Sequence, residues 1–156
     1  MNDRNFRNTL IELLRGGQAH LSVEKAIEGI SLNHITLRPS NMQHCVWETL
    51  EHIRIAQQDI LRYTLDPNWQ SPPFPQGYWP SNIEPTENAW NDCISGFLAD
   101  FHEVIKLVED TSLDLTSEIP HGEGRTYLRQ ILLVADHNSY HTSEIVQIRK
   151  ALRIWQ

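Results

Sequence analysis

The stretch RTYLRQILLVADHNSYHTSEIVQIRKALRI, residues 125–154, decides the fold of this chain. Apolar residues such as Val134, Ile145 and Ile148 recur in it at the spacing of one face of an α-helix. At about 1.5 Å per residue, such a helix is about 45 Å long. No competing alternation of apolar and polar residues is present in this or any other window of useful length. The sequence therefore predicts an all-α fold that ends in one long helix.

The same helical period recurs upstream of this stretch. We expect four further helices: one that Asn2 or Asp3 caps and Gly16-Gly17 ends, a short one over residues 21–28, and two long ones over residues 42–63 and 86–109. Ser40 followed three residues later by Gln43 predicts a capping box before the 42–63 helix. Together these helices predict a four-helix bundle in which residues 1–156 form a single domain.

Residues 66–85 interrupt the helical pattern. Six of the eight prolines lie there, and proline at that density excludes both a helix and a central strand. The segment also contains four large aromatic residues: Trp69, Phe74, Tyr78 and Trp79. We therefore expect an ordered crossover loop that packs across the helices rather than a disordered linker. Its aromatic side chains either wall a pocket or simply cover the core.

Composition excludes several classes of protein. The 156 residues include 20 acidic and 13 basic side chains, and the formal charge of −7 argues against binding to nucleic acid or to an anionic membrane surface. The chain has no stretch that resembles a signal peptide or a membrane-spanning helix. Cys45 and Cys93 lie far apart and indicate free thiols in a reducing compartment. We expect a soluble cytoplasmic protein.

The last helix carries the clearest functional pattern of the chain. His137 and His141 are four residues apart, so they share a helical face and can chelate one metal ion. The face continues through Leu133, Val134 and Ile145, and we therefore expect both rings to point into the bundle. The alternative is a pair of buried neutral histidines with ordinary hydrogen-bond partners. A metal site needs a third ligand from another helix.

His52 is the best candidate for that third ligand. It shares a helical face with Cys45, Thr49 and Ala56, a stripe of small or apolar residues that we expect to face the core. A single histidine on such a face is otherwise a hydrogen-bonded core residue. The other histidines are poorer candidates, because they are rotated away from this face, lie in connectors or have no other marker of function: His20, His34, His44, His102 and His121.

Three segments of the chain resemble a known family: Arg38-Pro39, the run WETLEH at residues 47–52 and the run ADHNSYH at residues 135–141. The sequence resembles the DinB-like (DinB/YfiT) superfamily of bacterial metal-binding four-helix bundles over nearly its whole length. The resemblance implies that His52, His137 and His141 bind a divalent metal ion, with water completing the coordination. Ser143-Glu144 stands where the family commonly has Gly-Gln.

A site of three neutral imidazoles leaves at least one coordination position open, as catalytic metal sites do. Nitrogen ligands favour Zn²⁺ or Ni²⁺ over Mg²⁺ or Ca²⁺, which prefer oxygen. Carboxylates commonly orient the ligand rings, and four are close in sequence: Glu48, Glu51, Asp136 and Glu144. Adjacent helical residues diverge by about 100°, so Glu51 and Asp136 would have to serve a ligand on another helix.

The resemblance implies a metal-dependent transferase or hydrolase acting on a small molecule, with a low-molecular-weight thiol as a second reactant. It also implies a homodimer. Two other functions remain open at this point. The chain can be a metal-binding or stress-response module without turnover, or a structural helical dimer whose histidines belong to the core.

Overall fold

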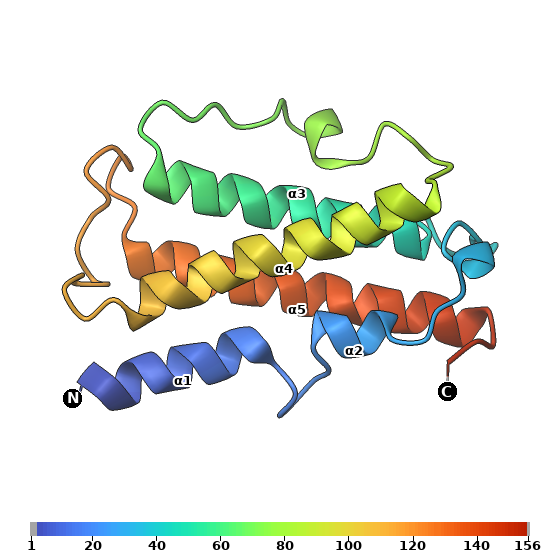
Figure 1. Cartoon of the computed structure of the whole chain (residues 1–156), viewed down its shortest axis with the longest axis horizontal. Coiled ribbons are helices and arrows are strands. Elements are labelled where there is room, and N and C mark those ends of the chain that lie inside the picture. The colour runs from blue at the N-terminus through green and yellow to red at the C-terminus, as the bar shows by residue number, and fades with distance from the viewer. Residues whose placement is uncertain (1–2, 156) are drawn as a thin grey trace.

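The computed structural model describes residues 3–155, and these form helices joined by loops (Figure 1). The α-helices are α1 (Asp3–Arg15), α2 (Val23–Ile27), α3 (Val46–Leu65), α4 (Glu87–Glu109) and α5 (Tyr127–Ala151). Short 3-10 turns occupy Leu32–His34 and Gln76–Tyr78. Within the described residues there is no strand, only one isolated bridge between Glu118 and Thr126. The all-α prediction is confirmed.

The helices form a four-helix bundle, as predicted. Helix α3 packs against both α4 and α5, while α1 packs against α5 and α4. Helix α2 lies beyond the end of α1 and also packs on α5, so α1 and α2 together take the fourth position (Figure 1). None of the described helices is both long enough and apolar enough to cross a bilayer.

The 66–85 segment determines the direction of α4. It returns along α3 from the end of that helix to the end where α3 began, so α3 and α4 run in the same direction (Figure 1). Side-chain hydrogen bonds to α3 hold the segment. Trp69 Nε1 and the Tyr78 hydroxyl donate to the two oxygens of Asp59 at 2.8 and 2.7 Å, and Trp47 Nε1 donates to the Asn82 carbonyl at 2.7 Å.

Helix α3 begins later than predicted. Its N-cap is Cys45, and the partner is Glu48, whose Oε2 accepts the Cys45 backbone N–H at 2.8 Å. The predicted box at Ser40 and Gln43 is wrong, because that segment forms a turn in which the Met42 N–H bonds to the Pro39 carbonyl. Helix α5 spans Tyr127–Ala151 rather than 125–154. The predicted cap at Asn2 lies outside the described residues.

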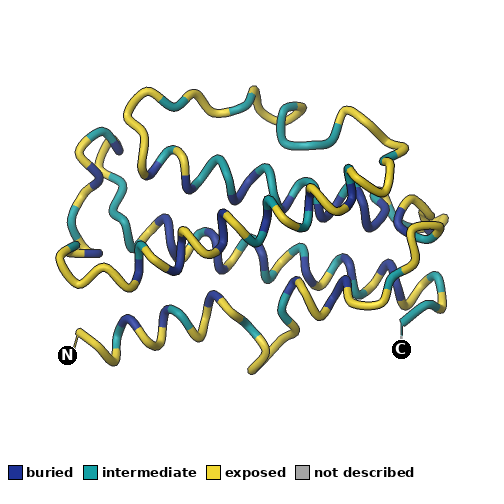
Figure 2. Tube along the Cα trace, viewed as in Figure 1, coloured by how far each residue is buried: buried dark blue, intermediate teal, exposed yellow. Residues whose placement is uncertain are grey.

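The core forms where α3, α4 and α5 face one another. Buried positions recur along these helices, whereas the segment that crosses above α3 is exposed or partly buried (Figure 2). Leu50 and Ile53 of α3, Val108 of α4 and Ile145 and Ile148 of α5 have no exposed surface. A buried polar pair lies among them. Asn138 Nδ2 donates to Gln57 Oε1 at 2.9 Å, and Gln57 Nε2 donates to the Phe97 carbonyl at 2.8 Å.

Two neighbouring residues of α5 test this packing. Ile131 is 1% exposed and lies in the core, whereas Leu132 is 41% exposed. Truncating Ile131 to alanine leaves a cavity and should lower the free energy of unfolding by about 2–5 kcal/mol. The same truncation at Leu132 should cost about 1 kcal/mol or less. Urea unfolding followed by circular dichroism measures both, and equal losses would contradict the assignment of this helical face.

Candidate metal centre

Three imidazole nitrogens meet between α3 and α5. His52 Nε2 lies 3.1 Å from His141 Nε2 and 3.1 Å from His137 Nε2. One ligand atom from each ring lies within 4.8 Å of the other two. Nitrogens bound at about 2.0–2.1 Å to one tetrahedral ion are about 3.3 Å apart. The structure therefore brings the three predicted ligands together at the spacing that a single metal ion requires.

The rings lie at the edge of the core rather than inside it. All three histidines are partly buried, whereas Val134 and Ile145, which we expected on the same face, are fully in the core. The 66–85 loop covers the face of α3 and α5 from which the rings project, and its residues line the same cavity as the three histidines. Val134 and Ile145 share this side of α5 with the two rings, as predicted, but the rings reach the edge of the core rather than its interior.

Hydrogen bonds at the opposite ring nitrogens determine two of the tautomers. His52 Nδ1 lies 2.8 Å from the carbonyl oxygen of Tyr78, which can only accept, so Nδ1 carries the proton. His141 Nδ1 lies 2.9 Å from Oε2 of Glu144. The bond to His141 lowers the pKa of Glu144, so this carboxylate is ionised and accepts a proton from Nδ1 as well. In both rings Nε2 is left with its lone pair.

With both rings neutral, the two lone pairs face each other at 3.1 Å and repel, because neither nitrogen then has a proton to donate. A cation between them turns that repulsion into coordination. The third ring, His137, is suited to the same ion. Burial lowers its pKa to about 4, with smaller contributions from His141 and His52, so the ring is neutral at pH 7. Burial also lowers the pKa of His52. Neutral imidazole is the form that binds metal, so these residues fit a divalent ion.

Of the four predicted carboxylates, Glu144 is the one that bonds to a ring of the triad, at His141 Nδ1. Its second oxygen, Oε1, lies 3.2 Å from Nδ1 of His44, so one carboxylate joins His44 to His141. The other predicted candidates are engaged elsewhere or exposed. Glu48 bonds to Arg38 at 2.6 Å, Glu51 bonds to Arg54 at 2.6 Å, and Asp136 is exposed.

His44 and Trp79 complete the surroundings of the site. The Trp79 ring stacks on His52 at 4.1 Å and on His44 at 3.9 Å, so it lies between the two imidazoles. His44 was not predicted here, because its direction was counted as a rotation along the same helix as His52. His44 precedes the N-cap Cys45 and is not part of α3, so that rotation does not apply. The pairing of His44 with Glu144 has no signal in the spacing of the sequence.

The remaining histidines lie away from this centre. His121 Nε2 bonds to the Tyr63 carbonyl at 2.8 Å, and His20 Nδ1 to the Leu21 carbonyl at 2.8 Å. His102 is exposed on α4, and His34 ends a 3-10 turn. As expected, these four do not join the site.

The three histidines line a cavity of about 500 Å³. Its lining residues come from α3, from α5 and from the crossover loop. The lining residues besides the three histidines are Ala56, Asp59, Ile60, Phe74, Pro75, Tyr78, Trp79 and Leu133. This volume is in the range of small-molecule sites in proteins. At least four loop residues thus wall a pocket.

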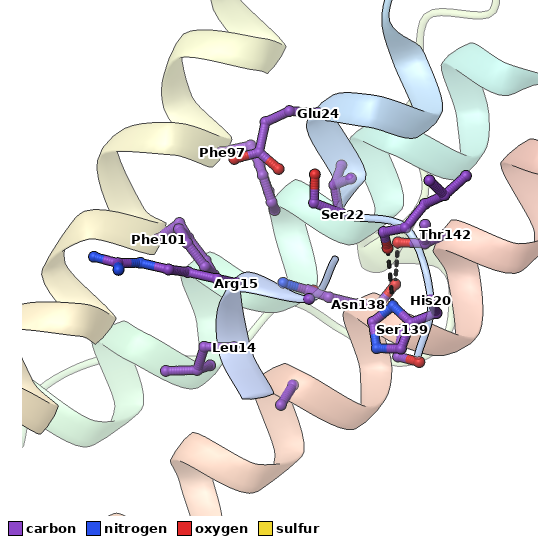
Figure 3. A pocket seen from close by; sticks show the side chains of 14 residues that line it. Leu14, Arg15, His20, Ser22, Glu24, Phe97, Phe101, Asn138, Ser139 and Thr142 are labelled. Atoms are coloured by element: carbon purple, nitrogen blue, oxygen red, sulfur yellow. Dashed lines mark hydrogen bonds between the residues drawn. The ribbon is translucent and has the colours of Figure 1, made fainter. Parts of the chain in front are cut away.

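A second cavity lies among the ends of α1 and α2 and the sides of α4 and α5 (Figure 3). Its volume is about 10 Å³, enough for about one water molecule. Phe97 and Phe101 of α4 border it on one side, and Asn138 and Thr142 of α5 on another (Figure 3). The Thr142 hydroxyl donates to the Asn138 carbonyl rather than to the space. This cavity is too small for a substrate.

A family model of the DinB superfamily matches residues 18–145. The matched range contains all three converging histidines together with the crossover loop. Comparison with curated proteins and with solved structures finds no match to this chain.

Replacing Glu144 by glutamine tests the orienting carboxylate. The amide can still accept from His141 Nδ1 but has no charge, so we expect metal affinity to fall about tenfold, at the lower end of the effect of such partners. A competition titration against a chromophoric chelator measures this change. Glu103→Gln is the matched control, because Glu103 is exposed on α4 and pairs only with Lys106 among the bonds described. Unchanged affinity in Glu144→Gln would count against the assigned role.

Proposed function

Because the chain belongs to the DinB superfamily and its three histidines converge beside an open cavity, we propose that it is a metal-dependent enzyme acting on a small molecule. In this proposal the ion activates a low-molecular-weight thiol, which attacks an electrophilic substrate. The observation that carries the proposal is the meeting of three Nε2 atoms at a wall of the 500 Å³ cavity.

The number of ligands supports a catalytic rather than a structural ion. Structural zinc sites are closed by four protein side chains, whereas catalytic sites have three and keep a position for water or substrate. Among the described residues, the group that can hold an ion contains three histidines and no fourth side chain. The adjoining cavity gives a small molecule access to the remaining position.

The two cysteine thiols of the chain are unsuited to act as the nucleophile. Cys45 and Cys93 are both buried, and neither lines the cavity. Burial raises the pKa of the Cys45 thiol to about 11 and raises that of Cys93 further still. A thiol with so high a pKa is a poor nucleophile at neutral pH. The nucleophilic sulfur therefore has to come from a second molecule.

The three histidines supply neutral nitrogen ligands, and Glu144 holds His141 in the tautomer that coordinates. We expect Zn²⁺ or Ni²⁺ because nitrogen donors suit these ions. When bound, such an ion lowers the pKa of a coordinated thiol or water. In the transfer itself the thiol proton passes to solvent and the sulfur forms a bond to the electrophilic carbon. The leaving group departs with the electron pair of the bond that breaks.

Metal content tests the ligand set. Purified wild type should carry about one Zn²⁺ or Ni²⁺ per chain, and His52→Ala should lose most of it because two imidazoles alone bind weakly. Elemental analysis by mass spectrometry measures both. His102→Ala is the control, since His102 is exposed on α4. If all three proteins carry the same amount of metal, well below one ion per chain, the assignment of the three histidines as a metal site is rejected.

Turnover tests the reaction. Metal-loaded wild type should conjugate a small thiol to a chlorodinitrobenzene, with release of chloride, faster than the uncatalysed reaction. The His52→Ala variant should fall to the uncatalysed rate, a loss of about a hundredfold or more, because the metal-dependent activation is removed. Absorbance of the dinitrophenyl thioether follows the reaction. If a fully metal-loaded wild type accelerates the attack of no thiol on a panel of electrophiles, the proposed reaction is rejected.

A further inference from the structure

The wall of the cavity lacks positive side chains. Among the described residues that line it there is no lysine or arginine. The side chains beyond the metal ligands are aliphatic or aromatic, apart from one carboxylate: Ala56, Ile60, Phe74, Pro75, Tyr78, Trp79, Leu133 and Asp59. A substrate that entered this space would contact an apolar surface over most of its body.

Asp59 adds a negative charge to that surface. Its two oxygens accept hydrogen bonds from Trp69 Nε1 and the Tyr78 hydroxyl, at 2.8 and 2.7 Å. Both donors are uncharged. Burial, together with Asp59, raises the pKa of Tyr78 to about 12, so its hydroxyl keeps the proton. The loop therefore satisfies the hydrogen bonding of Asp59 without neutralising its charge.

The arginines of α3 are committed to other partners. Arg54 bonds to Glu51 at 2.6 and 2.7 Å, and the nearest carboxylate to Arg62 is Asp100 of α4, at 3.5 Å. Neither arginine lines the cavity. An anionic group on a bound molecule would thus lose water without gaining a cationic partner from these residues, which is unfavourable.

The rim of the cavity presents an unusually exposed aromatic side chain. Phe74 is 85% exposed, and its ring meets that of Tyr78 edge to face, with centroids 6.1 Å apart. A ring that lines a cavity and remains open to solvent can bury more of its surface when an apolar molecule binds, and that burial is favourable.

We propose that this site selects an uncharged, apolar molecule, aromatic or aliphatic, and discriminates against one that carries a carboxylate on its body. The inference rests on the proposed function for the reacting group, a thiol that coordinates the ion. It assigns the specificity to Asp59 and to the apolar wall formed by Ile60, Phe74, Tyr78 and Leu133. The thiol consumed would accordingly differ in class from the carboxylate-rich peptide thiols.

A matched series of thiols tests this selectivity in the Co²⁺-loaded protein. The series is phenylmethanethiol, the same molecule with a para carboxylate, and the same molecule with a para aminomethyl group. The sulfur-to-cobalt charge-transfer absorption reports coordination without requiring turnover. We expect the neutral thiol to bind at least about tenfold more tightly than the carboxylate. The cation should bind more tightly than the carboxylate because of Asp59. Equal or tighter binding of the carboxylate would overturn the proposal.

Adding a cation to the wall should change the selectivity. Leu133→Arg places a positive charge in the lining, and Ile60→Lys does so from α3 if the first variant does not fold. In either variant we expect the preference for the neutral thiol over the carboxylate to shrink by about tenfold. Leu132→Arg is the control, because Leu132 is the exposed neighbour on α5 and does not line the cavity. A shift as large in the control, or an unchanged preference in a cobalt-binding wall variant, would reject the role of the wall.

These outcomes separate the specificity from the reaction. Thiol coordination with the expected selectivity but without conjugation would reject the proposed reaction and support the assigned specificity. Conjugation with a preference for the carboxylate thiol would support the proposed reaction and reject the assigned specificity. Failure of the wild type to bind Co²⁺ or Zn²⁺ would reject both.

Discussion

The buried hydrogen bond between Asn138 and Gln57 determines how α5 lies along α3, and the rest of the site depends on it. Both side chains are enclosed, so a shift of either helix would leave an amide without a partner at a cost of about 1–3 kcal/mol. Gln57 also donates to the backbone of α4, and the same pair therefore ties three helices together. His137 directly precedes Asn138. When the amides meet, His137 and His141 come to lie opposite His52.

The part of this arrangement that follows from helical periodicity could be predicted from the sequence. The spacing of His137 and His141 places two rings on one side of a helix, and the stripe of small and apolar residues around His52 indicates the third. The resemblance of the 47–52 and 135–141 runs to a known family supports the same three. All three meet in the structure. The start of α3 could not be predicted, because Ser40–Gln43 has the stronger local capping signal whereas the N-cap in the structure, Cys45, is not a residue type preferred there. Tertiary contacts favour Glu48, which Arg38 also binds.

The contributions of non-helical residues were not predictable. His44 precedes α3, and its approach to Glu144 depends on the path of the chain before Cys45. The Tyr78 carbonyl that bonds to His52 belongs to a loop whose course the proline pattern does not specify. Asp59 had no marker, because its partners Trp69 and Tyr78 come from that loop. Periodicity locates ligands on helices, whereas the residues that orient them and shape the cavity follow from loop geometry.

The bond between the Tyr78 carbonyl and His52 makes the loop and the metal thermodynamically linked. An ion bound at Nε2 favours the tautomer with a proton on Nδ1, and this Nδ1–H group donates the hydrogen bond to the Tyr78 carbonyl. By reciprocity, a molecule that binds the loop in this position and strengthens ion binding is itself bound more tightly, by the same factor, when the ion is present. A molecule that binds against Trp79 and Tyr78 would thus change the affinity of the three histidines for an ion.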